Sequence, residues 1–370
     1  MKPNILFILL DGARWDRMDI SPEIKELKSE GTTFTNISSA IPYTFGAMNV
    51  IFTGLYGKEN GVDAYYKMFR LKDSVDFLPE LLNKNGYFTC SSLISDKVIS
   101  SRGFDIHESY DEHKVDPSEY HIEFLKNCFN KAKDKPVFAF LQFSKIHTST
   151  VTEVLKKYEW NDKKFYENKK ENLKIYDQAF LEAGIYAKQI SEYIKNLNKS
   201  NETFLIFFTD HGTGVGERFG ERNYGVFLYE ETIRTSFIFI GPKILKNKEY
   251  DKLLGSINLM PTLLELCGIE SINSLQGKSF AKLLFDSSNL IEDEFTFSET
   301  GGLQGPHPSP MEPNVFCIKN RQHKLIYFKT SEEWKLFDLQ NDPKELDNKY
   351  GSDLEIEEKF KQTLLSWIDR

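Results

Sequence analysis

FLIFFTDHG, at residues 204–212, is the stretch that decides the fold. Five apolar residues are followed at once by a threonine, an acid, an imidazole and a glycine. A continuous apolar run is typical of a parallel strand that helices cover on both faces. Ligands of open α/β sheets bind just beyond the carboxyl ends of the strands, where Asp210 and His211 would lie. These side chains suit a divalent metal, although an isolated Asp-His pair is equally compatible with a plain strand end and turn.

The same pattern occurs near the N-terminus. Residues 5–12 have the sequence ILFILLDG, in which an apolar run again precedes an acid and a glycine. Two parallel strands that both end in aspartate at one edge of a sheet would bring Asp11, Asp210 and His211 together. Three such ligands leave a coordination position open, as a catalytic metal requires. We therefore predict a metal site at this edge.

The rest of the chain predicts how the sheet is built. Further strand-like runs lie at residues 87–93, 137–143 and 236–240, and helical periodicity lies at residues 21–30, 78–85 and 177–197. Strands that alternate with helices predict an α/β fold with a mostly parallel sheet flanked by helices. Short strands at 315–319, 324–328 and 334–338 predict a small C-terminal antiparallel sheet, which residues 354–368 would close as an amphipathic helix. We accordingly divide the chain into a catalytic domain, 1–294, and an antiparallel subdomain, 295–370, that completes the same fold.

Composition excludes some classes of function. The 370 residues carry a formal net charge of -8, with acidic and basic residues interspersed, so a nucleic-acid partner is not expected. The four cysteines are far apart and form no metal-binding pair, which favours free, buried thiols in a reducing compartment. The apolar run at residues 5–10 is too short for a secretory signal and is interpreted as a strand. We expect a cytoplasmic protein without a membrane anchor.

A third segment supplies a hydroxyl. Residues 42–54, PYTFGAMNVIFTG, predict a helix with Thr44 as its N-cap and Gly54 as its C-cap. A hydroxyl at a helix N-terminus lies where backbone N–H groups favour a bound oxyanion, although capping alone would also explain this threonine. Two irregular, glycine-rich or proline-rich stretches, 212–225 and 301–313, are long enough to shape a substrate pocket.

Taken in order, these segments resemble the sulfatase family of the alkaline phosphatase superfamily. The matching stretches are ARWD at 13–16, GTTFTN at 31–36, FTGLY at 52–56, LLNKNGY at 81–87, TDHG at 209–212, LYEE at 228–231, MPTLL at 260–264 and LFDLQNDP at 336–343. The resemblance implies an alkaline-phosphatase-like fold and a divalent metal (Zn, Mn or Ca) held by Asp11, Asp210 and His211. It also implies that Thr44 occupies the nucleophile position and contacts the metal.

The site departs from sulfatases in two ways. Sulfatases carry Cys or Ser in a Cys/Ser-x-Pro-x-Arg signature that is oxidised to formylglycine, whereas Thr44-Phe45-Gly46-Ala47-Met48 cannot mature in that way. The usual acidic pair is reduced to Asp11-Gly12. Both departures resemble phosphoethanolamine and phosphoglycerol transferases. Near residue 224, where relatives supply Lys or His, the chain has NYGV at 223–226.

These observations lead to a predicted mechanism. We expect a metal-dependent hydrolase or transferase that acts on phosphate-type esters, in a small molecule or a glycan, through a covalent Thr44 intermediate. His147, which follows the strand at 137–143, matches a family position that faces substrate and is expected to protonate the leaving group or to bind the oxyanion. Two alternatives remain open: a sulfuric ester hydrolase that lacks formylglycine, and an inactive homologue that only binds a glycan or a partner.

Overall fold

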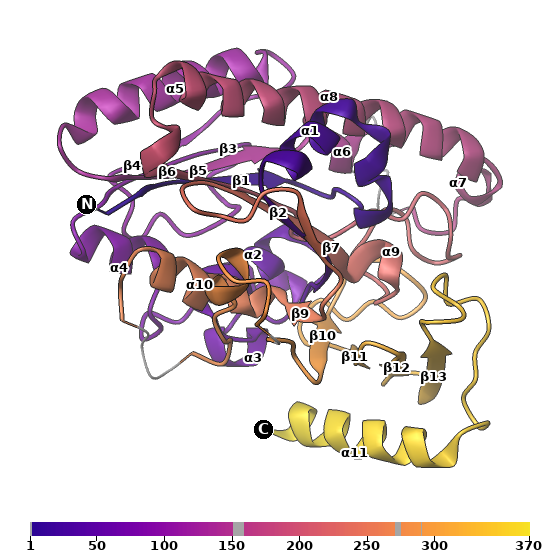
Figure 1. The fold of residues 1–370 in the computed structure, drawn as a ribbon. Helices are drawn as coiled ribbons and strands as arrows, with labels where there is room; N and C mark the ends of the chain where they lie inside the picture. The colour runs from indigo at the N-terminus through magenta and orange to yellow at the C-terminus, as the bar shows by residue number, and fades with distance from the viewer. Residues whose placement is uncertain (1, 151–158, 271–274, 290) are drawn as a thin grey trace.

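A mixed β-sheet forms the centre of the computed structural model, which describes residues 2–150, 159–270, 275–289 and 291–370. Within these residues the sheet has nine strands in the order β4-β3-β5-β1-β6-β7-β2-β8, with β9 alongside β2 (Figure 1). The strands are β1 (Asn4–Leu10), β2 (Thr32–Ser38), β3 (Phe88–Leu93), β4 (Ile106–Ser109), β5 (Val137–Phe143), β6 (Thr203–Phe208), β7 (Arg234–Ile240), β8 (Lys248–Tyr250) and β9 (Leu254–Gly255).

Most neighbouring strands of this sheet are parallel, as predicted. β1 pairs in parallel with β5 on one side and with β6 on the other, and only β7 runs antiparallel to its neighbours, β6 and β2, among the described strands. All five strands predicted for this sheet are present. β2, β4, β8 and β9 were not predicted, because they are short or carry several polar residues.

Helices cover both faces of the sheet. α1 (Pro22–Glu30), α5 (Pro117–Ala132) and α8 (Lys169–Asn196) lie on one face, and α2 (Thr44–Thr53), α4 (Leu78–Lys84) and α10 (Leu259–Leu266) lie on the other (Figure 1). The side chains of β1 alternate between two apolar clusters, with Leu6 and Ile8 in one and Ile5 and Phe7 in the other. This double burial explains why the strand is apolar throughout.

Short helices lie in the connections. They are α3 (Gly57–Asn60), α6 (Lys145–Thr148), α7 (Lys163–Glu167) and α9 (Glu230–Ile233), with 3₁₀ turns at Trp15–Ile20, Tyr65–Lys67, Ser200–Glu202, Ser256–Asn258 and Ala281–Leu284. Among the residues that the structure describes, no helix combines the length and the apolar character needed to cross a bilayer.

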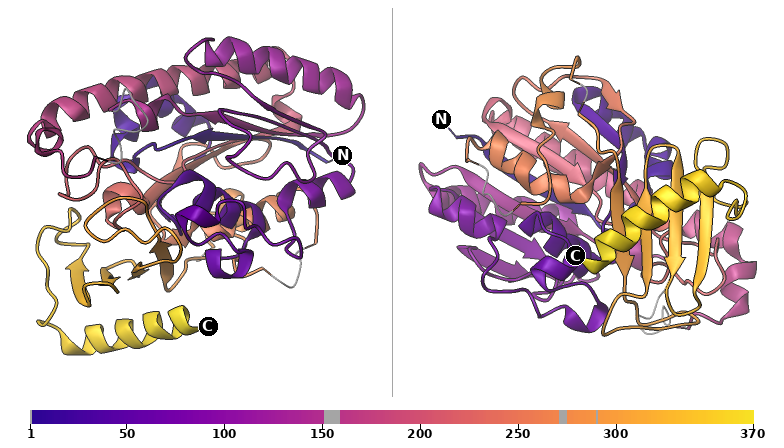
Figure 2. Two further views of the ribbon diagram at one scale, coloured as in Figure 1. Left: turned by 180° about the vertical axis from the view of Figure 1, so that it is seen from behind. Right: turned by 90° about the horizontal axis from the view of Figure 1, so that it is seen from below.

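The C-terminal part has the predicted antiparallel sheet and closing helix. β10 (Thr296–Thr300), β11 (Val315–Lys319), β12 (His323–Phe328) and β13 (Glu333–Asp338) follow one another in the sheet. α11 (Leu354–Asp369) lies across one face of it (Figure 2) and packs there through Phe360, Leu364 and Trp367. The backbone N–H of Glu299 on β10 donates to the carbonyl of Ala40, at 2.9 Å, so β10 is hydrogen-bonded to the segment that follows β2.

The cysteines lie as expected. Cys90, Cys128, Cys267 and Cys317 are all buried and free. Burial raises the pKa of Cys317 to about 12, which makes its thiol a poor nucleophile. The compartment of the protein and its division at residue 294 stay predictions.

Candidate active site

The ends of β1 and β6 bring the three predicted metal ligands together. β1 and β6 are adjacent and parallel, with Leu9 opposite Phe208, so the residues that follow them meet at one edge of the sheet. Asp11, Asp210 and His211 are all buried, and one ligand atom from each lies within 4.8 Å of the others. We call these three residues the metal-site cluster.

Thr44 contacts this cluster with its hydroxyl group. Thr44 Oγ1 lies 3.3 Å from each carboxylate oxygen of Asp11 and 3.2 Å from Nε2 of His211. The prediction that Thr44 is an N-cap is wrong: Tyr43 occupies that position, no side chain caps the helix, and Thr44 is its first residue. The hydroxyl faces the cluster instead of the helix amides. Gly54, with φ 63°, ends α2 as predicted.

Hydrogen bonding leaves His211 ready to bind a cation. Its Nδ1 lies 2.8 Å from the carbonyl oxygen of Gly212, which can only accept a hydrogen bond, so Nδ1 carries the proton. In the neutral ring, Nε2 then presents a lone pair toward Thr44 and the two aspartates. A backbone carbonyl that fixes the tautomer in this way is typical of metal-ligating histidines.

Within the described part of the chain, the two aspartates lack a compensating lysine or arginine. Asp210 Oδ2 is buried and has no hydrogen-bond partner among the described residues, and within the same residues neither Asp11 nor Asp210 forms an ion pair with lysine or arginine. Burial raises the pKa of Asp210 well above its usual range, and the charge of Asp11 acts in the same direction. A divalent cation would satisfy the unpartnered oxygen and neutralise both carboxylates, so the donor set fits a metal.

A further set of residues, not predicted from the sequence, orients Asp11. Gln142 Nε2 donates to Asp11 Oδ2 at 2.7 Å, and Ser144 Oγ donates to the same oxygen at 3.4 Å. Gln142 is the only polar residue of β5, VFAFLQF, and that isolated polar side chain was the available signal. Gly12 has φ +75°, and a Cβ there would lie 2.7 Å from the Cβ of His147. A second acid at this position would therefore be strained in this backbone.

His147 lies beside the cluster rather than in it. It belongs to α6, and its Nδ1 lies 2.9 Å from the carbonyl oxygen of Ser144, the residue that contacts Asp11. Its ring stacks on Tyr224 at 5.7 Å between centroids, and Tyr224 in turn lies 4.4 Å from the ring of His211. No contact of the described residues joins His147 directly to Thr44.

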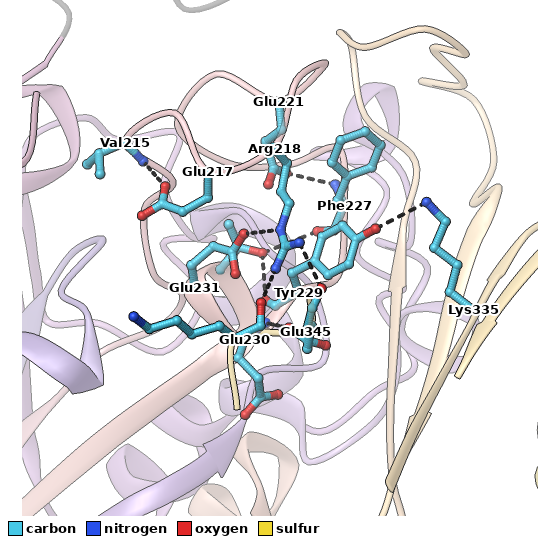
Figure 3. A network of polar contacts seen from close by, with 12 residues as sticks. Val215, Glu217, Arg218, Glu221, Phe227, Tyr229, Glu230, Glu231, Lys335 and Glu345 are labelled. Atoms are coloured by element: carbon cyan, nitrogen blue, oxygen red, sulfur yellow. Dashed lines mark hydrogen bonds and ion pairs between the residues drawn. The ribbon is translucent and has the colours of Figure 1, made fainter. Parts of the chain in front are cut away.

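The 212–225 loop divides its contacts between the cluster and the C-terminal part. The hydroxyl of Thr213, near the start of the loop, donates to the carbonyl of Gly12, whereas Arg218 pairs with Glu231 at 2.8 Å and donates to the carbonyl of Glu345 at 2.9 Å (Figure 3). Gln304, from the 301–313 loop, donates to the carbonyl of Tyr224 at 3.0 Å. The two loops are therefore bonded to each other and hold Tyr224 against His211.

Known proteins resemble this chain along nearly its whole length. The family model "Sulfatase" matches residues 3–269, and the model "N-sulphoglucosamine sulphohydrolase, C-terminal" matches residues 220–369. An arylsulfatase of Clostridium perfringens (strain 13 / Type A) is 24% identical over 459 residues, which cover 95% of this chain and 91% of the relative. Arylsulfatase K of Xenopus laevis is 25% identical over 186 residues, 49% of this chain and 34% of that protein. A solved 2-O GAG sulfatase superposes with a TM-score of 0.84 at 18% identity, covering 100% of this chain and 92% of that one.

The fold and the strand-end cluster define an alkaline-phosphatase-like α/β protein, as expected from the sequence. Within that class, the chain belongs to the sulfatase family. The prediction of phosphate-ester hydrolysis or transfer is wrong, because these named relatives and this structural neighbour are sulfatases. It gave too much weight to two local departures, Thr44 and the Asp11-Gly12 pair, against a resemblance that extends over nearly the whole chain.

Proposed function

We propose that this chain hydrolyses sulfuric esters with Thr44 as the nucleophile, without formylglycine. The observation that carries the proposal is the contact of Thr44 Oγ1 with both oxygens of Asp11 and with Nε2 of His211. A hydroxyl placed between a carboxylate and an imidazole can lose its proton to an adjacent acceptor as it attacks. The substrate class, a small-molecule or glycan-linked sulfate ester, agrees with the arylsulfatase and GAG sulfatase named above.

Asp11, Asp210 and His211 would hold the metal, with Thr44 Oγ1 beside them. When bound, a divalent cation would neutralise sulfate oxygens and make the threonine hydroxyl more acidic. An imidazole among the donors favours Zn over Ca, which prefers oxygen ligands alone. We propose a first-row transition metal on this ground.

The protein groups then account for the bonds and protons. Thr44 Oγ1 forms a bond to sulfur while the bond from sulfur to the alcohol oxygen breaks, and the threonine proton passes to Asp11. His147 in its imidazolium form keeps Nδ1–H on the Ser144 carbonyl and donates the Nε2 proton to the leaving alcohol oxygen. Water then attacks the sulfur of the threonine sulfate while the bond from sulfur to Thr44 Oγ1 breaks. The water gives a proton to neutral His147, and Asp11 returns its proton to Thr44 Oγ1, so that sulfate is released and all three side chains are restored.

The test compares three forms of the protein on an aryl sulfate with a divalent metal present. Thr44→Ala is expected to lose activity by a factor on the order of 10⁴ or more, whereas Thr44→Ser retains the hydroxyl and a measurable rate. Thr363→Ala, on the outer helix α11, is the matched control and retains full activity. Mass spectrometry of the quenched wild type should find one SO₃ group on Thr44. Undiminished turnover by Thr44→Ala, or faster turnover of the matching aryl phosphate, would contradict the proposal.

A further inference from the structure

A cavity adjoins the metal-site cluster on the side of His147. Its volume is about 580 Å³, which is within the range of small-molecule sites. Residues 109–113, which begin at the end of β4, form one wall, and His147 and Tyr224 form the wall nearest the cluster. Because His147 is the proposed proton donor to the leaving oxygen, the alcohol part of the ester would enter this cavity.

Glu112 is the buried acid of this cavity. Its exposed fraction is 5%, and its Oε2 accepts a hydrogen bond from the backbone N–H of Ser144 at 3.0 Å. The second oxygen, Oε1, has no hydrogen bond within the described part of the chain, and the carboxyl forms no ion pair with a lysine or arginine there. One oxygen of this buried carboxyl, in the wall of the cavity, is therefore available to accept a hydrogen bond from a ligand.

The ionisable side chains around the cavity include two acids and no permanently charged base. Among the described residues that line it, these side chains are Tyr110, Asp111, Glu112, His113, His147 and Tyr224, and none is a lysine or arginine. Burial raises the pKa of Glu112 to about 7, and the charge of Asp11 acts in the same direction, whereas the Ser144 amide and the charge of Lys145 lower it. A positive charge in the cavity would favour the ionised form of Glu112, and a negative charge would oppose it.

We propose that this cavity selects sulfate esters whose alcohol part carries an amine or another cationic group, with Glu112 as the residue that recognises the charge. The inference rests on the proposed function, since it assumes that the ester is cleaved at Thr44. It goes beyond that function by naming the substrate class. An ammonium donates hydrogen bonds to the available carboxylate oxygen of Glu112, and the tyrosines Tyr110 and Tyr224 line the same cavity.

Three aryl sulfates that differ only at the far end of the ring test this inference. They are tyramine O-sulfate, 4-ethylphenyl sulfate and the O-sulfate of 4-hydroxyphenylacetate, whose far ends are positive, neutral and negative. We expect kcat/KM to fall in that order, with at least a tenfold difference between the extremes. Glu112→Gln, which keeps an oxygen for the Ser144 amide, should reduce the advantage of tyramine sulfate over the neutral ester at least fivefold while changing the neutral ester little. Glu119→Gln, the same change at an exposed position of α5, should leave the ratio as in the wild type.

The outcomes separate this inference from the proposed function. Turnover of the neutral ester with no preference for tyramine sulfate overturns the inference and leaves the proposed function standing. If no aryl sulfate is cleaved, the proposed function fails, and calorimetry with tyramine, 4-ethylphenol and 4-hydroxyphenylacetate then tests the cavity by binding alone. If Glu112→Gln melts at a lower temperature than the wild type, Glu112→Asp keeps the charge and should keep the preference; loss of the preference in that folded variant counts against the role of charge.

Discussion

Asp11 and Asp210 at the ends of β1 and β6 can be compared with Glu230 and Glu345, which are just as deeply buried. Glu230 Oε2 lies 2.8 Å from Nζ of Lys319, and Glu345 Oε1 lies 2.8 Å from Nζ of Lys324. We call these four residues the lysine cluster. Their negative charges have partners within the protein, and the neighbouring lysines hold the pKa of Glu230 well below its usual range.

The metal-site cluster differs from a structural ion-pair network in the charges that surround its acids. In the lysine cluster, α9 is joined to the C-terminal sheet, because Glu230 comes from α9, Lys319 from β11 and Lys324 from β12. Glu345 also accepts a hydrogen bond from the backbone N–H of Glu230 (Figure 3). The metal-site cluster has two acids, one imidazole and no such lysine among the described residues. A buried set of acids that the chain itself leaves unbalanced is where a cation is expected.

Replacing one acid of the metal-site cluster should give the largest effect. In Asp210→Asn, activity on an aryl sulfate is expected to fall by a factor on the order of 10³ or more, because a metal ligand is lost. In metal-free buffer the same variant should be more stable to denaturant than the wild type by about 1–2 kcal/mol, because the repulsion between two buried carboxylates is removed. A variant that is both inactive and less stable without metal would place Asp210 with the structural acids.

Breaking the lysine cluster should lower the stability and leave the activity nearly unchanged, which is the opposite of the result expected for Asp210→Asn. Lys324→Met leaves Glu345 buried without its lysine, which typically costs about 3–5 kcal/mol of unfolding free energy. Activity per folded molecule should stay near the wild-type value, because Lys324 contacts no residue of the metal-site cluster. Lys359→Met, on the exposed side of α11, is the control and should change stability by less than about 0.5 kcal/mol. Urea unfolding measures the free energy of unfolding, and a rate measured at low temperature gives the activity per folded molecule.

Removing the metal tests the difference between the metal-site cluster and the lysine cluster in the wild type itself. A cation that binds only the folded protein stabilises it by about 2.7 kcal/mol at a concentration 100 times its dissociation constant. We expect added Zn or Mn to raise the melting temperature of the wild type and of Lys324→Met, and a chelator to reverse the rise. Asp210→Asn should show almost no rise. An equal rise in Asp210→Asn would mean that the metal binds elsewhere.

Much of this site was predictable because a strand end combines two signals. An apolar run that stops at an acid locates both a buried parallel strand and its functional edge, so Asp11, Asp210 and His211 followed from the sequence. The direction of the Thr44 hydroxyl did not follow, because a helix N-terminus offers it two partners and only the tertiary structure chooses between them. Glu112 and Tyr224 were not identified as site residues either, since they lie in loops without periodicity. Their place beside His147 depends on the packing of α6 and of two long loops.

Glu299, on β10, is a buried acid of a third kind, which belongs neither to the metal-site cluster nor to the lysine cluster. Among the described residues it has no lysine partner. Burial raises its pKa to about 8, and Asp63 acts in the same direction. In the unfolded chain the group ionises near pH 4.5, so between pH 4.5 and 8 folding takes up a proton and stability falls as the pH rises. We expect the wild type to lose about 2 kcal/mol of unfolding free energy between pH 6 and 8 through this group. Glu299→Gln, measured by urea unfolding at both pH values with metal present, should show a correspondingly smaller loss; an unchanged slope would mean that Glu299 is ionised in the folded protein.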